Sequence, residues 1–203
     1  MSSSTSPKNR VGSTVVAALL VCWTPPVALA QATAASLQVN FTASADSFKA
    51  ATEEYRAIWA KEGSRIVAAM ERLSGLRFEK GPIGASVYEG VSYSGAPGGP
   101  PMVLRASYPE PTKRGTLVHE LAHRLAIDVR VPFDHHELIF LFVYDAWIDL
   151  WGQTFADAQV AVESKRTGLV DYASIWKKTL AIPASERPRR LQQFIEQYGK
   201  PRG

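Results

Sequence analysis

Three residues of one short segment have the types and the spacing of a metal site. His119 and His123 lie four positions apart in the segment LVHELAHRLA, and Glu120 directly follows the first histidine. On a helix, residues i and i+4 lie one above the other on the same face, so both imidazoles can reach one metal ion. Glu120 then projects beside the site, where it can take a proton from a metal-bound water. The pattern predicts a catalytic zinc site with two histidine ligands and a general base.

A catalytic zinc ion has three protein ligands and an open position for water, so a third ligand has to come from elsewhere in the chain. All four histidines lie between positions 119 and 136. We favour His136, because at helical spacing it shares an apolar face with Phe140, Val143 and Trp147. Other residues of suitable type follow the motif, and they stay open as alternatives: His135, Glu137, Asp145 and Asp149.

Helices are expected on both sides of the chain's central part. Apolar residues recur at spacings of three, four and seven from Phe48 to Leu73, with Gly75 as a stop signal and Gly63 as a position where the helix can break. A helical period returns at Thr116 and continues to the end of the chain. Asp134 is expected to cap the helix that carries His136, with Glu137 completing a capping box.

The sequence pattern between 76 and 108 predicts short strands. The runs LRFEK, SVYEGVSY and MVLRASY are separated by glycines and prolines, above all in SGAPGGPP at 94–101. We expect two or three antiparallel strands with a long exposed hairpin loop, and we expect 31–45 to be a loose lead-in. A helix, a small antiparallel sheet, the motif helix and a mainly helical C-terminal part make an α+β fold.

The first thirty residues have the features of a secretory signal peptide. Lys8 and Arg10 precede the apolar run at 11–23, and the small-residue pattern Ala28-Leu29-Ala30 follows. We expect cleavage after Ala30 and a secreted or periplasmic mature chain that forms a single domain over 31–203. The apolar run is much shorter than the ~20 residues that span a bilayer, so stable membrane insertion after cleavage is not expected.

Composition excludes several classes of protein. The formal net charge is +4 without a clustered basic run, which argues against a dedicated nucleic-acid binder. Cys22 is the single cysteine, so the chain has no internal disulfide framework, no Cys-rich zinc ribbon and no CxxC redox motif.

The HExxH motif, His119-Glu120-x-x-His123, with a helix and small sheet before it and a ligand-bearing helix after it, resembles the zincin metallopeptidases over roughly residues 46–152. Metzincins place a glycine and a third histidine where this chain has Ala126 and Val129, so the third ligand is not of the metzincin type. Gluzincins take a glutamate from a following helix. SprT-like proteases take a later histidine in an H-x-x-x-F setting, which His136 and Phe140 fit, but their zinc ribbon is absent. The chain is also similar to small secreted bacterial proteins of zincin type.

The motif and the resemblance together imply an exported zinc metallopeptidase that acts on a peptide or protein substrate. Zn²⁺ would be held by His119, His123 and His136, with Glu120 as general base. A substrate is expected to pair with the strand at 102–107, and Tyr108 or Tyr144 is a candidate to stabilise the oxyanion. Two alternatives stay open, a catalytically inactive zinc-stabilised binding or scaffold module and a cell-wall peptide amidase. The sequence does not indicate an oligomeric state.

Overall fold

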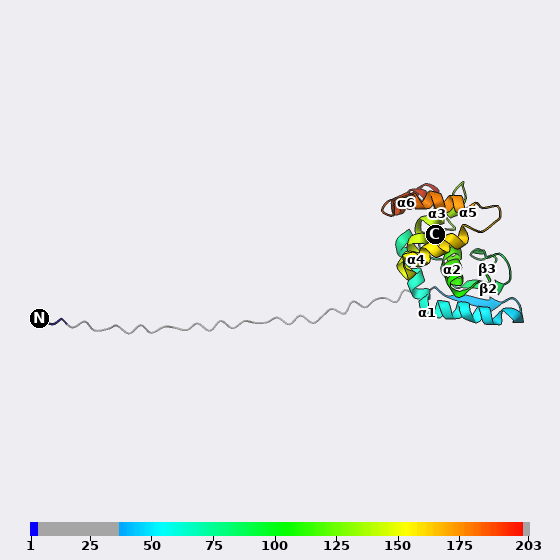
Figure 1. Cartoon of the computed structure of the whole chain (residues 1–203), viewed down its shortest axis with the longest axis horizontal. Helices are drawn as coiled ribbons and strands as arrows, with labels where there is room; N and C mark the ends of the chain where they lie inside the picture. The colour runs from blue at the N-terminus through cyan, green and yellow to red at the C-terminus, as the bar shows by residue number, and fades with distance from the viewer. Residues whose placement is uncertain (4–36, 201–203) are drawn as a thin grey trace. The chain divides into compact units, whose positions relative to one another are not determined.

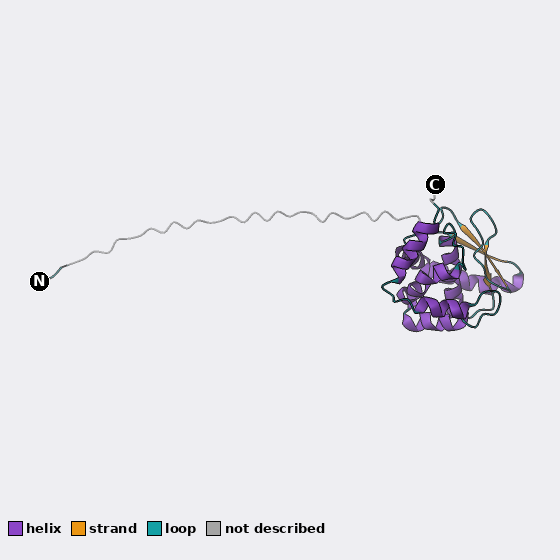
Figure 2. Cartoon of the chain, turned by 90° about the horizontal axis from the view of Figure 1, so that it is seen from above, coloured by secondary structure: helices purple, strands orange, loops and turns teal. Residues whose placement is uncertain are grey.

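The computed structural model describes residues 1–3 and 37–200, so the expected signal peptide and its cleavage site lie outside the described residues. Within them the chain is a mixed α/β structure with a three-stranded sheet beside a body of helices (Figures 1 and 2). None of the helices in this part of the chain is long and apolar enough to cross a membrane.

The elements run along the chain in the order β1 (Val39–Ala43), a 3-10 turn (Asp46–Phe48), α1 (Lys49–Ser74), β2 (Ile83–Tyr88), β3 (Met102–Arg105), α2 (Glu110–Leu125), α3 (His136–Trp151), α4 (Gln153–Glu163), α5 (Tyr172–Leu180) and α6 (Arg187–Tyr198).

Helix α1 forms where the periodicity predicts it. Its apolar stripe, which includes Tyr55, Ile66 and Met70, is buried. The helix ends at Gly75, whose φ of 72° is the left-handed conformation that glycine adopts without a Cβ penalty, and whose N–H donates to the Glu71 carbonyl. Gly63 does not split the helix, since α1 is continuous through it.

The sheet is parallel, so the expectation of an antiparallel sheet was wrong. The strand order is β1-β2-β3, with Val39 opposite Ile83 and Ala85 opposite Met102. Strand β1 comes from the segment expected to be a loose lead-in, and α1 is the crossover between β1 and β2. The connection at 89–101 returns the chain to the starting edge of β2, which makes β3 parallel as well.

The glycine- and proline-rich connection contains the one antiparallel pairing in the described residues that touches the sheet. Tyr93 exchanges two main-chain hydrogen bonds with Val103 of β3, at N···O distances of 3.0 and 2.8 Å. The Arg105 N–H donates to Ser92 Oγ, and its carbonyl accepts from the Tyr55 hydroxyl. These groups of β3 are already paired within the chain, so the edge expected to bind an extended substrate is occupied.

Helix α3 is the centre of the hydrophobic core. Every residue from 138 to 143 is at most 2% exposed, and the helix packs against α1, α2, α4, α5 and α6. The apolar face that the sequence predicts for this helix, with His136, Phe140, Val143 and Trp147, is buried. Because α3 packs on α2, its first residue, His136, is held beside the motif helix.

Candidate metal centre

Helix α2 places the two motif histidines on one face. It begins after Pro109, with Pro111 in its first turn, where a missing N–H has no cost. Leu117, Val118 and Leu121 are fully buried around the polar residues, so the helix is fixed in the core. The rings of the two motif histidines, His119 and His123, have centroids 5.0 Å apart.

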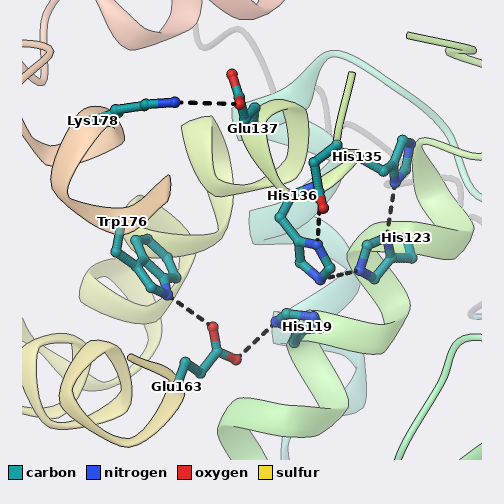
Figure 3. A network of polar contacts seen from close by, with 9 residues as sticks. His119, His123, His135, His136, Glu137, Glu163, Trp176 and Lys178 are labelled. Atoms are coloured by element: carbon teal, nitrogen blue, oxygen red, sulfur yellow. Dashed lines mark hydrogen bonds and ion pairs between the residues drawn. The ribbon is translucent and has the colours of Figure 1, made fainter. Parts of the chain in front are cut away.

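His136 completes a cluster with these two histidines (Figure 3). Each of the three residues offers a ring nitrogen, and the three nitrogens lie within 4.8 Å of one another. The Nε2 atoms of His123 and His136 are 3.2 Å apart. Two nitrogens that bind one tetrahedral metal ion at ~2.0–2.1 Å are about 3.3 Å apart, so this separation fits a shared ion. The three histidines can therefore hold a metal ion.

Two of the alternative ligands lie in other contacts. The Asp145 carboxylate pairs with Arg187, whose Nε is 3.0 Å from Oδ2. The Asp149 carboxylate pairs with Arg72 at 2.8 Å. Both aspartates are on α3, but they lie more than two turns after His136, which is in its first turn.

Asp134 fixes the position of His136. Its Oδ1 accepts from the His136 main-chain N–H at 2.8 Å, as a helix cap, and lies 2.7 Å from His136 Nδ1. With Nδ1 held by the carboxylate, Nε2 is the nitrogen left for a metal ion. Glu137, another alternative ligand, does not complete a capping box, because its carboxylate faces Lys178 Nζ at 3.8 Å (Figure 3).

A buried glutamate that the sequence analysis did not single out contacts the His119 ring. Glu163, the last residue of α4, has Oε1 2.8 Å from His119 Nδ1, an ion-pair contact whose angle is outside hydrogen-bond geometry. Its Oε2 accepts from Trp176 Nε1 at 3.0 Å, and Arg166 Nη1 lies 3.6 Å from its Oε1. One signal was available: Ala156, Gln159 and Glu163 form the buried face of α4 at helical spacing.

Burial dominates the electrostatics of the cluster. It raises the pKa of Glu120 to about 7, with Glu163 raising it further and His119 and Arg166 opposing the rise. Burial and the neighbouring His119 lower the pKa of His136 to about 4.

The pKa of His119 is raised, in contrast to that of His136. Burial opposes its protonation, but the Glu163 carboxylate raises its pKa, and the same contact lowers the pKa of Glu163 against its own burial.

The tyrosine nearest the cluster is one that the sequence analysis did not identify. The Tyr172 ring, at the start of α5, lies 4.7 Å from the His136 ring and 6.3 Å from the His119 ring. Arg166 lies over it, 5.5 Å from its centroid. The Tyr144 hydroxyl, one of the two expected oxyanion donors, instead donates to Asp157 at 2.6 Å. Tyr108, the other expected donor, has Arg105 over its ring at 5.4 Å.

No family model, no curated protein and no solved structure matches this chain. The support for a metal centre is therefore the geometry of the three histidines, and the resemblance to zincins stays a prediction from the motif.

Proposed function

We propose that the protein is an exported zinc-dependent hydrolase that cleaves peptide bonds, with His119, His123 and His136 as zinc ligands and Glu120 as general base. The observation that carries this proposal is Glu120, a buried carboxylate beside His119 that is not one of the three clustered ligand candidates. A structural zinc site is closed by four ligands, whereas a catalytic site has three and keeps one position open.

The donor set favours zinc among the metals. Three imidazoles without a thiolate suit Zn²⁺, Cu²⁺, Fe²⁺ or Ni²⁺, and three histidine ligands are a known catalytic zinc arrangement. When bound, the zinc ion supplies Lewis acidity, which polarises a carbonyl and lowers the pKa of water towards ~7.

Glu120 supplies the proton transfer. Glu120 is 3% exposed, and in the described part of the chain its carboxylate interacts with nearby charges and accepts no hydrogen bond from the protein. A carboxylate with no protein donor can accept a proton from water and pass it to the leaving amine, first as a general base and then as a general acid.

The substitution Glu120→Gln tests this role. The amide is close to isosteric but cannot accept the water proton, so hydrolysis of casein or of peptidoglycan peptides should fall by about 10²–10⁴-fold. Zinc content should stay unchanged. Glu137→Gln is the matched control, because Glu137 lies on α3 and faces Lys178, and it should leave hydrolysis unaffected.

Three results would change the proposal. Loss of zinc in Glu120→Gln would make Glu120 a ligand. A wild-type protein that binds zinc and cleaves nothing would be a binding or scaffold module. Cleavage of peptidoglycan peptides but not of casein would make the protein a cell-wall peptide amidase that uses the same residues.

A further inference from the structure

Two consecutive histidines contact opposite sides of one ligand ring (Figure 3). His123 Nε2 is 3.2 Å from His136 Nε2, on the side where the three candidate ligands converge. His123 Nδ1, at the other side of the same ring, is 2.8 Å from Nδ1 of His135. His135 therefore contacts the side of the His123 ring that faces away from the other two histidines, and it is not part of the cluster.

The hydrogen bonds determine which nitrogens carry protons. The Ala126 carbonyl can only accept, and it lies 3.3 Å from His135 Nε2, so this nitrogen is the donor. A neutral imidazole with a proton on Nε2 has a lone pair on Nδ1. His123 must then donate from its own Nδ1 to His135, which leaves the lone pair of His123 on Nε2, towards the other two histidines.

We propose that His135 is a positioning residue, which holds the His123 ring in the tautomer and orientation that point Nε2 at the metal. This inference rests on the metal-binding part of the proposed function.

The three histidines of the cluster then share one arrangement. Nδ1 of His119 contacts Glu163, Nδ1 of His136 contacts Asp134, and Nδ1 of His123 contacts His135. Partners of this kind orient metal-binding imidazoles, and their loss typically weakens metal affinity or activity by ~10–100-fold. The partner of His123 differs from the others because it is an uncharged imidazole rather than a carboxylate.

Zinc affinity of His135 variants, measured on the full protein by competition with a chelator of known affinity, tests the inference. His135→Phe keeps a ring of similar size and removes the acceptor, so affinity should fall by ~10–100-fold. His135→Asn places Oδ1 near the position of Nδ1, can accept the His123 proton, and should recover most of the affinity. Phe133→Ala is the control. It removes the contact with Phe194 from the same α2–α3 connection that holds His135, and it should leave zinc affinity unchanged.

A second measurement reads the protons themselves. Long-range ¹H–¹⁵N correlation of the imidazoles in the wild-type protein should show His135 protonated on Nε2, with and without zinc. A proton on His135 Nδ1 overturns the inference, because that nitrogen could not accept from His123.

The outcomes separate this inference from the proposed function. Unchanged zinc affinity in His135→Phe overturns the positioning role and leaves the hydrolase proposal intact. Equal losses in His135→Phe and His135→Asn also overturn it, since the acceptor would then not matter. A wild-type protein that binds no zinc overturns both.

Discussion

The start of α3 and the second half of α2 contribute to the same cluster by different means. On α2, the helical repeat alone brings His119 and His123 to one face. At the start of α3, the His136 ring depends on the Asp134 carboxylate and on the packing of α3 against α2. A pair of ligands within one element is encoded locally, whereas a ligand from a second element depends on contacts that only the folded chain provides.

The α2 ligands should show the largest effect. His123→Ala should abolish stoichiometric zinc, because only His119 and His136 would remain as ligands and two imidazoles do not hold the ion tightly. Metal bound only by the folded state adds to its stability, by about 4 kcal/mol when free zinc is 1,000 times the Kd. Metal analysis and chemical unfolding with and without a chelator measure both effects. Wild-type zinc content in this variant would contradict the account.

His136→Ala should also remove tight zinc binding, because it deletes the ligand that α3 contributes. Asp145→Asn is the control on the same helix: it should keep zinc and lower the free energy of unfolding, because it weakens the pair with the buried Arg187. Chelator competition and urea unfolding separate the two. An experimental structure with a carboxylate at ~2.0–2.2 Å from zinc and His136 elsewhere would contradict this assignment.

Glu163→Gln should weaken zinc binding without removing a ligand. Glu163 is 2% exposed, and the variant removes its charge from beside His119 Nδ1. Arg166 also loses this carboxylate as a partner. We expect zinc affinity to fall by ~10–100-fold, measured by chelator competition. An affinity equal to that of the wild type would show that His119 needs no support from α4.

Asp134→Asn should have the smallest effect of the series. Asparagine is as good a helix cap as aspartate, so the bond to the His136 main-chain N–H should persist and unfolding should change little. The loss of the Asp134 charge beside His136 Nδ1 should still lower zinc affinity, towards the lower end of the ~10–100-fold range. A large loss of stability here would mean that the capping role dominates.

The parts of the fold that depend on periodicity were predictable. The apolar stripe of α1 and the strongly apolar sequence of α3 indicate helices and their burial. Strand β1 was missed, although Val39 and Phe41 are buried in alternation with exposed neighbours, because a strand of five residues gives a weak signal. The parallel pairing could not be read, since it depends on where the connection at 89–101 returns the chain.

The same limit applies to the site. His119, Glu120 and His123 form a local pattern, and His136 could be favoured from its helical face. Glu163 and Tyr172 come from α4 and α5, and no spacing relates them to the motif. The sequence offers His135 as an alternative ligand, and only the folded chain shows its contact with His123 Nδ1.

The metal content of the purified wild-type protein tests the central claim most directly. The account predicts about one zinc ion per chain, with a free energy of unfolding that falls when a chelator removes it. A protein that carries no stoichiometric metal, and whose stability does not respond to a chelator, would contradict it.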